Sequence, residues 1–191
     1  MIPTDQLVVL TGGPGGGKTT LIEALAREGF RTVPESGRGV IREEMAAGGS
    51  ALPWADREAF ARRMAALDEA NHAAALAGER GGEGQADGDG TTIFDRGLPD
   101  VLGYLRLCGL PEPDALLHAA WRLRYRREVF LAPFWPEIFA GDAERRQDAR
   151  EAAETARVMR LTYESLGYEV TDLPLAPVAE RLRFLRSRLG L

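Results

Sequence analysis

The sequence predicts an α/β fold in which a five-stranded parallel sheet is covered by helices on both faces. Short apolar runs rich in β-branched residues alternate along the chain with longer segments of helical spacing, which is the order typical of a parallel sheet. The first run, residues 7–10, is apolar throughout, as expected for a strand buried on both sides. At 191 residues, the chain has the length of one domain, and we expect residues 1–191 to form it.

The five strands are expected at residues 7–10, 31–35, 91–95, 128–132 and 168–173. Helices fill the intervals between them. The longest is expected between Trp54 and Ala77, where large apolar side chains punctuate an alanine-rich run. Residues 78–90 contain six glycines and few apolar residues, so we expect a flexible loop there.

Composition excludes several classes of protein. No apolar stretch reaches the roughly 18 residues of a membrane span, and the first residues lack the features of a secretory signal, so a cytoplasmic protein is expected. A single cysteine, Cys108, and two separated histidines argue against disulfides and zinc. The net charge of −5 argues against a broad nucleic-acid surface.

Lys18 is the only lysine among 24 basic residues, and it lies in a glycine-rich segment between an expected strand and an expected helix. The pattern Gly-x-x-x-x-Gly-Lys-Thr in this context is the Walker A motif, or P-loop, whose backbone N–H groups wrap the phosphates of ATP. Lys18 would meet the β- and γ-phosphates, and Thr19 would bind the Mg²⁺ that arrives with the nucleotide. The nucleotide-binding residues predicted here are Gly12, Gly13, Pro14, Gly15, Gly16, Gly17, Lys18, Thr19 and Thr20. A chance glycine turn is the alternative, which the flanking strand and helix disfavour.

Two carboxylates follow expected strands, where α/β sheets bind their ligands. Asp95 closes the third strand, at the place of the acid that holds Mg²⁺ in P-loop proteins, and Glu35 closes the second. Each has a structural alternative. Asp95 could cap the helix that starts near Leu98, and Glu35 could favour the start of its own helix through the helix dipole.

Four segments together resemble the NadR-like AAA ATPase family. They are the P-loop, Val33-Pro34-Glu35-Ser36-Gly37-Arg38, Phe94-Asp95-Arg96-Gly97-Leu98-Pro99-Asp100, and Trp135-Pro136-Glu137-Ile138 with the following Asp142-Ala143-Glu144-Arg145-Arg146-Gln147-Asp148. The resemblance covers nearly the whole chain. It implies a phosphotransferase fold similar to ribosylnicotinamide kinases and, more distantly, deoxynucleoside kinases.

By this resemblance, Glu35 would be the base that faces the acceptor hydroxyl, and Arg96 would clamp phosphate or acceptor. Arg145 and Arg146 would close over the phosphates from a lid at about residues 134–150. Gly97 departs from deoxynucleoside kinases, which usually have serine or a larger residue there, so the acceptor stays open. The alternative for the lid arginines is a solvated helix face with acidic partners.

Two further groups of residues have a functional and a structural interpretation. An acceptor or base pocket could be lined by aromatic residues, although such residues are more often core: Trp54, Tyr104, Phe134 and Trp135. A basic cluster is expected mainly to form a solvated face: Arg122, Arg124, Arg126 and Arg127.

Two functions remain. The first is a kinase that transfers the γ-phosphoryl group of ATP to a small nucleoside-like or riboside-like acceptor, and the second is a nucleotide-binding switch that acts through a protein or lipid partner. Standard GTPases need a second lysine that the chain lacks, and hexameric motors need a further helical domain. The sequence does not identify the acceptor, since its pocket is assembled from distant segments.

Overall fold

A computed structural model describes residues 4–78, 90–138 and 149–191 of the chain. Five strands form one sheet in the order β2-β3-β1-β4-β5, and every pair is parallel, which confirms the expected fold class. The strands are β1 (Leu7–Gly12), β2 (Arg31–Val33), β3 (Thr92–Asp95), β4 (Glu128–Ala132) and β5 (Glu169–Asp172).

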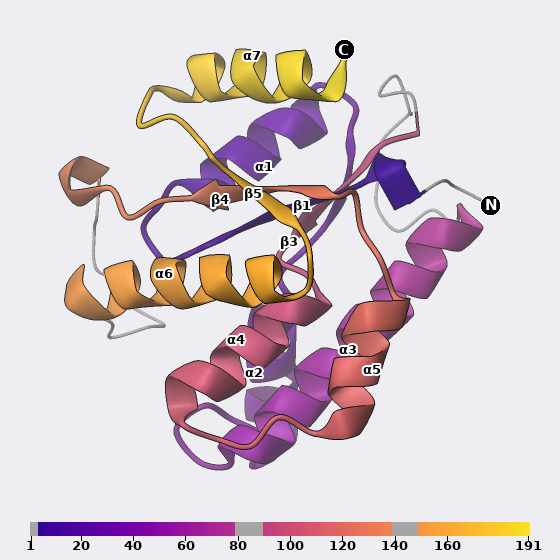
Figure 1. Ribbon diagram of the computed structural model, residues 1–191. Helices are drawn as coiled ribbons and strands as arrows, with labels where there is room; N and C mark the ends of the chain where they lie inside the picture. Colours follow the sequence, from indigo (N-terminus) through magenta and orange to yellow (C-terminus); the bar gives the residue numbers. More distant parts are fainter. Residues whose placement is uncertain (1–3, 79–89, 139–148) are drawn as a thin grey trace.

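Helices cover both faces of the sheet (Figure 1). On one face, α1 and α7 pack side by side, and on the other lie α2 to α6. The helices are α1 (Lys18–Arg27), α2 (Ser36–Ala47), α3 (Arg57–Ala77), α4 (Leu98–Cys108), α5 (Asp114–Arg122), α6 (Ala149–Ser165) and α7 (Val178–Leu189). Two 3-10 turns complete the structure at Thr4–Gln6 and Pro136–Ile138.

The central strand β1 contributes side chains to the hydrophobic core on each face of the sheet. Its side chains point alternately to the two faces, so Val8 and Leu10 join the core under α1 and α7, while Leu7 and Val9 join the larger core on the other side. All four are fully buried. The continuous apolar run is therefore the signature of a strand with a core on each face.

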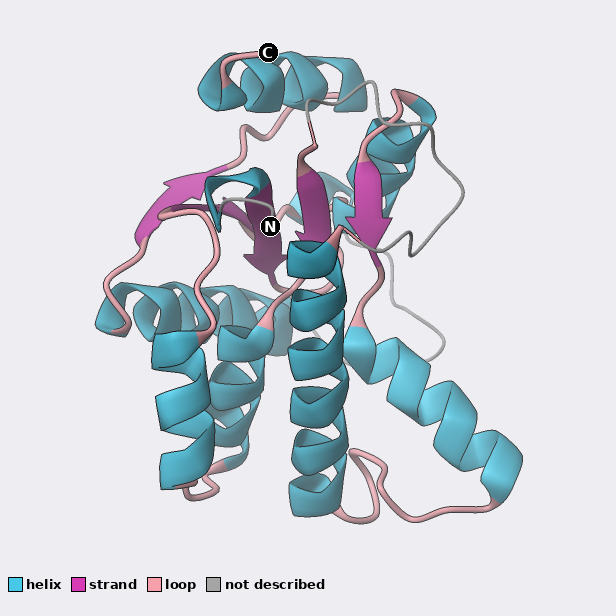
Figure 2. Ribbon diagram, turned by 90° about the vertical axis from the view of Figure 1, so that its right-hand side faces the viewer, coloured by secondary structure: helices cyan, strands magenta, loops and turns pink. Residues whose placement is uncertain are grey.

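The strands end at one edge of the sheet. Leu10 pairs with Asp95 of β3, and Val33 of the edge strand β2 pairs with Phe94. Figure 2 shows the strands pointing toward a group of helices that extends from this edge. The segments that follow β1, β2 and β3 are thereby brought together, which is how the sequence motifs come to share one site.

Some predicted boundaries were too long. β2 ends at Val33 rather than at residue 35, because Pro34 has no N–H to donate to the sheet. The long helix starts at Arg57, where the Asp56 side chain accepts a hydrogen bond from the Ala59 N–H at 2.9 Å. The predicted loop at residues 78–90 lies almost wholly outside the described residues. No described helix is long and apolar enough to cross a membrane.

Candidate functional site

The glycine-rich segment joins β1 to α1, as the P-loop prediction requires. Its glycines are needed for two reasons. Gly12, Gly15 and Gly17 have φ values of +126°, +73° and +73°, which side chains with a Cβ rarely adopt. In addition, a Cβ on Gly13 would lie 2.3 Å from the Ala152 carbonyl oxygen of α6. At Gly12 and Gly13 the loop therefore packs its backbone against the backbones of Ala132 and Ala152, where a side chain has no room.

Lys18 begins α1 and is almost fully buried. Its ammonium group lies over the loop and donates hydrogen bonds to the carbonyl oxygens of Gly12 at 3.2 Å and Gly13 at 2.7 Å. Thr19, the next residue, is exposed at the start of the helix. The loop thus presents an ammonium group and a hydroxyl beside a helix N-terminus, whose dipole favours anions.

Asp95 ends β3 beside the P-loop strand. Its Oδ1 atom is buried and, within the described part of the chain, has no hydrogen-bond partner. Burial raises the pKa of this carboxyl, and the charge of nearby Lys18 opposes that rise. An orphaned carboxylate oxygen next to the P-loop lysine fits a hard cation such as Mg²⁺, with Thr19 and Asp95 as the residues to hold it.

Arg96 is the only described non-glycine residue with a left-handed backbone, at φ +72°. This conformation costs about 1–2 kcal/mol for a residue with a Cβ. The backbone N–H donates to the Leu10 carbonyl oxygen at 2.9 Å. The guanidinium group pairs with Glu35 at 3.3 Å and with Asp100 at 2.9 Å. Since strain of this kind persists only where contacts enforce it, the two ion pairs fix the direction in which Arg96 points.

Arg96 stays charged although it is buried. Burial alone would lower the pKa of its guanidinium group, but Glu35, Asp100 and Asp95 outweigh that effect and raise it.

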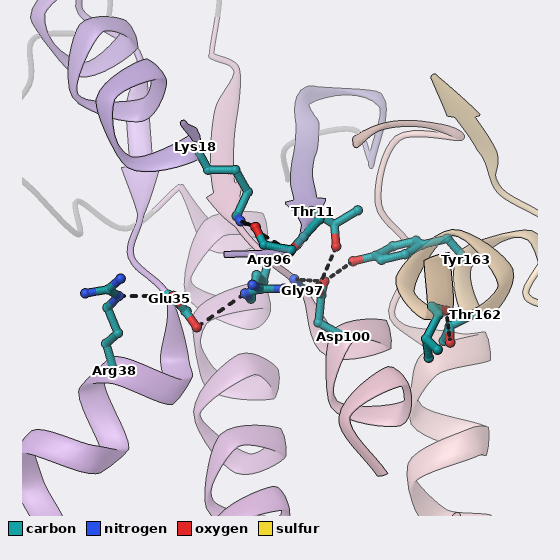
Figure 3. A network of polar contacts seen from close by, with 12 residues as sticks. Thr11, Lys18, Glu35, Arg38, Arg96, Gly97, Asp100, Thr162 and Tyr163 are labelled. Atoms are coloured by element: carbon teal, nitrogen blue, oxygen red, sulfur yellow. Dashed lines mark hydrogen bonds and ion pairs between the residues drawn. The ribbon is translucent and has the colours of Figure 1, made fainter. Parts of the chain in front are cut away.

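Glu35 precedes α2, and its side chain is 8% exposed. Besides its ion pair with Arg96, it accepts a hydrogen bond from Arg38 Nε at 3.3 Å. Figure 3 shows Glu35 between the guanidinium groups of Arg38 and Arg96, with Lys18 above Arg96 in this view. The structure therefore brings together four of the predicted site residues: Lys18, Glu35, Asp95 and Arg96.

A cavity of about 270 Å³ adjoins this group of residues. Glu35, Asp100 and Arg96 supply its charged groups, and Asp68 adds a further carboxyl group. Most of the remaining wall is apolar and includes Ile41, Trp54, Phe60, Met64, Val101, Tyr104, Leu107 and Met159. A mostly apolar cavity with a few converging polar groups is typical of a small-molecule site.

Residues 7–181 match a protein family described as "AAA domain". The chain belongs to this AAA-domain family. A search among curated proteins found no match.

Two of the solved structures that resemble this AAA domain are a NadR protein and a shikimate kinase. A NadR protein in complex with NR has a TM-score of 0.67 and 15% identity, and the match covers 97% of this chain and 51% of that one. This chain therefore spans about half the length of the NadR chain. Shikimate kinase from Acinetobacter baumannii in complex with shikimate has a TM-score of 0.56 and 11% identity, with 96% and 93% covered. At these identities the likeness shows the fold alone, which this chain shares with the NadR protein and the shikimate kinase, and it confirms the expected structural resemblance to NadR-like proteins.

The aromatic residues proposed for a pocket separate into two pairs in the AAA domain. Trp54 and Tyr104 line the cavity, and Trp54 stands at its rim, since it is 61% exposed. Trp135 and Phe134 are not among the residues that line it. Trp135 instead lies against Arg181, whose Cζ is 4.9 Å from the centre of the indole ring.

Gly97 does not line the cavity either. Its backbone is extended, but a Cβ there would lie 3.0 Å from the Tyr125 ring, whose hydroxyl accepts a hydrogen bond from the Leu98 N–H at 3.2 Å. The difference from deoxynucleoside kinases at this position thus reflects packing against Tyr125.

Asp100 and Asp68 have roles that the sequence did not reveal. Asp100 accepts hydrogen bonds from Thr11, Arg96, the Gly97 N–H and Tyr163, all within 3.0 Å (Figure 3). The only signal in the sequence was its place four residues after Arg96, in the first turn of the expected helix.

Asp68 of α3 is buried in the cavity wall, where it accepts a hydrogen bond from Ser36. Burial raises the pKa of Asp68 to about 8. Because Asp68 lies in the middle of a helix, no sequence pattern around it indicates that it is buried in the wall of a cavity.

The remaining arginines differ from one another. Arg145 and Arg146, with most of the predicted lid, lie outside the described residues. In the basic cluster, Arg122 and Arg127 are exposed, as expected of a solvated face. Arg124 and Arg126 are instead half-buried and donate hydrogen bonds to backbone carbonyls, including Leu166 at 3.0 Å and Asp5 at 3.3 Å. Their aliphatic stems are partly buried, while the guanidinium groups donate to backbone carbonyls near the ends of helical segments.

Proposed function

We propose that the AAA domain formed by residues 1–191 is an ATP-dependent kinase that phosphorylates a hydroxyl group of a nucleoside-like or riboside-like small molecule. One observation carries the proposal: the cavity opens beside Glu35 and Arg96, and Asp95 and Lys18 lie close to the same pair. An acceptor in the cavity would have a carboxylate and a guanidinium between it and the phosphates. A switch that only binds nucleotide has no need for such a cavity.

Each residue has a distinct part in this proposal. The P-loop amides and Lys18 bind the phosphates of ATP, and Glu35 takes the proton of the acceptor hydroxyl. Arg96 orients the reacting groups and balances charge on the transferred phosphoryl group. When Mg²⁺ is bound by Thr19, Asp95 and the nucleotide, it supplies further charge neutralisation. The resemblance assigns a similar role to Arg145 and Arg146, which stays a prediction.

The charges of the cavity narrow the choice of acceptor. Two carboxylates, those of Glu35 and Asp100, face one guanidinium group, that of Arg96, while Asp68, whose pKa is raised to about 8, holds its proton at neutral pH. A carboxylate or phosphate on the acceptor would be repelled there and would lose its hydration. We therefore propose a neutral or cationic acceptor, unlike the acid bound by the shikimate kinase. Since ATP is the phosphoryl donor, we propose that the enzyme works in the cytoplasm.

The test is ADP formation in the presence of single candidate acceptors. Neutral nucleosides, neutral and cationic ribosides, a nucleoside monophosphate and shikimate would each be added to the enzyme with ATP and Mg²⁺. We expect at least one neutral or cationic riboside to accelerate ADP formation about tenfold or more and to gain one phosphate by mass spectrometry. The Lys18→Met variant controls for contaminating kinases. If no acceptor accelerates ADP formation, the nucleotide switch becomes the better hypothesis.

A further inference from the structure

Arg181 is a fully buried arginine beside the P-loop that no sequence motif includes. It lies on α7, which packs against α1 on the opposite face of the sheet from the cavity (Figure 1). Only 1% of its surface is exposed, and it is the largest of the fully buried side chains in the described part of the protein. Removing a guanidinium group from water is costly, so its contacts should explain why it is there.

Among the described residues, the contacts of Arg181 are with uncharged groups. Arg181 Nε donates to the Pro174 carbonyl oxygen at 2.8 Å, Nη1 donates to the Gly16 carbonyl oxygen at 2.6 Å, and the Trp135 ring covers the group. The third nitrogen, Nη2, is buried without a hydrogen-bond partner among the described residues. Burial accordingly lowers the pKa of Arg181.

Arg96, a buried arginine with acidic partners, has very different surroundings from Arg181. Arg96 is nearly as buried, yet it has Glu35 and Asp100 as partners, and its pKa is raised. No described carboxylate pairs with Arg181. Its positive charge therefore lacks a counterion within the described structure, directly behind the loop that binds phosphate.

The bond to Gly16 also determines the direction of an amide group. In a trans peptide unit, the carbonyl oxygen of one residue and the N–H of the next point in opposite directions. Because the Gly16 oxygen is held toward Arg181, the Gly17 N–H points away from it. Gly17 permits the close approach, since a Cβ there would lie 3.0 Å from Arg181 Nη1. A P-loop needs its amides turned toward the phosphates and its carbonyls turned away.

We propose that Arg181 is a second cation of the nucleotide site, a positioning residue that orients the Gly16–Gly17 peptide and whose unpaired charge is matched by the phosphates of a bound nucleoside triphosphate. The proposal rests on the nucleotide-binding part of the proposed function and not on the identity of the acceptor. Lys18 acts from the front of the loop, and Arg181 acts from behind it. The electrostatic attraction between Arg181 and a bound nucleotide should grow with the number of charges on the phosphates.

The test compares nucleotide affinities of Arg181→Gln and Arg181→Met with the wild type, by titration calorimetry with ATP, ADP and AMP in the presence of Mg²⁺. We expect the dissociation constant for ATP to rise about tenfold or more, that for ADP to rise less, and that for AMP to change least. Arg186→Gln is the matched control, because Arg186 lies on the same helix but forms a half-exposed ion pair with Glu28 at 3.0 Å. It should bind all three nucleotides like the wild type.

A role in folding alone would not produce this ranking. A folded neutral variant that binds ATP as tightly as the wild type would overturn the proposal, and so would an equal loss of affinity for all three nucleotides. If both neutral variants fail to fold, Arg181→Lys decides. An ammonium group cannot bridge Pro174 and Gly16 as the planar guanidinium does, so we expect at least about fivefold weaker ATP binding, and unchanged binding would contradict the proposal. Wild-type protein that binds ATP but phosphorylates no acceptor would refute only the kinase.

Discussion

The Thr11 hydroxyl and the Asp100 carboxylate are 2.5 Å apart, although 89 residues separate them in the sequence. Thr11 lies on β1 directly before the P-loop, and Asp100 lies in the first turn of α4. The same carboxylate holds Arg96 and the Tyr163 hydroxyl of α6. One buried carboxylate thus connects the phosphate-binding segment, the guanidinium at the cavity and the helix behind them.

Asp100→Asn tests this connection. An amide cannot accept all four hydrogen bonds, and it leaves Arg96 with one carboxylate fewer. We expect the free energy of unfolding to fall by about 3 kcal/mol, as when one partner of a buried ion pair is removed. Tyr163→Phe removes a single hydrogen bond and should cost about 1 kcal/mol. Urea denaturation of both variants measures the difference, and equal small losses would show that the carboxylate is not the centre of the network.

Lys18→Met should abolish ATP turnover in a protein that remains folded. The ammonium group donates hydrogen bonds to the carbonyl oxygens of Gly12 and Gly13 in the loop, where the phosphates would bind, so its loss should affect phosphate binding more than the fold. Lys18→Arg should also be inactive, because a planar fork replaces a compact charge in a tight loop. Steady-state ADP formation and circular dichroism check both points. Turnover at the wild-type rate in either variant would refute the P-loop assignment.

Asp95→Asn should raise the Mg²⁺ concentration needed for half-maximal turnover and should slow turnover at saturation. The substitution removes a charge that a hard cation prefers. A magnesium titration of ADP formation measures both effects, and Asp114→Asn, an exposed acid at the start of α5, serves as the control. Unchanged magnesium dependence in Asp95→Asn would leave Asp95 with a structural role only.

Glu35→Gln should lower kcat for acceptor phosphorylation by about 10² to 10⁴, the usual contribution of a general base. The dissociation constant for ATP should change little, because Glu35 lies on the acceptor side of Arg96. Glu43→Gln is a matched control on α2, since Glu43 forms an exposed ion pair with Arg63. A loss of ATP affinity as large as the loss of kcat would contradict the role of Glu35 as the base.

The stability difference between Asp68→Asn and the wild type should depend on pH. The pKa of Asp68 is about 8 in the folded protein and close to 3.8 in the unfolded chain, so the folded state holds the extra proton between these values. Because of Asp68, wild-type stability should therefore fall as pH rises from about 4 to about 8. Above about pH 8 the ionised, buried carboxylate destabilises the folded protein to its full extent. Asparagine carries no such charge.

Thermal unfolding of both proteins from pH 4 to pH 9 measures this effect. We expect Asp68→Asn to gain stability relative to the wild type as the pH increases. Glu58→Gln, an exposed acid in the first turn of the same helix, controls for the change in net charge. A constant difference across the range would mean that Asp68 is already ionised at pH 4.

The predictable part of the site consists of residues fixed by local geometry. The P-loop needs glycines, a lysine and a flanking strand and helix within a short stretch, and Asp95 and Glu35 could be placed because strand ends meet at one edge of a parallel sheet. Their positions follow from sequence patterns of a few residues. The five strands could be located for the same reason, apart from the extension of β2 past Pro34.

Asp68, Asp100 and Arg181 could not be singled out, because their importance comes from contacts with distant parts of the chain. Asp68 looks like an ordinary acid on a helix until α2 and α4 enclose it. Arg181 is one of many arginines, and it becomes exceptional only when its guanidinium group meets Gly16, 165 residues earlier. Burial and pairing of charges are properties of the assembled fold, which no local pattern encodes.

The sheet order also determines when during synthesis the phosphate loop can form. β1 is made first among the strands, yet its two neighbours are β3 and β4, which begin at Thr92 and Glu128. The loop itself packs against Ala132 and Ala152. Contacts of such long sequence separation form late, since the intervening chain must first be closed into a loop. A nascent chain on the ribosome therefore carries the complete P-loop sequence for more than a hundred residues of elongation before it can hold ATP.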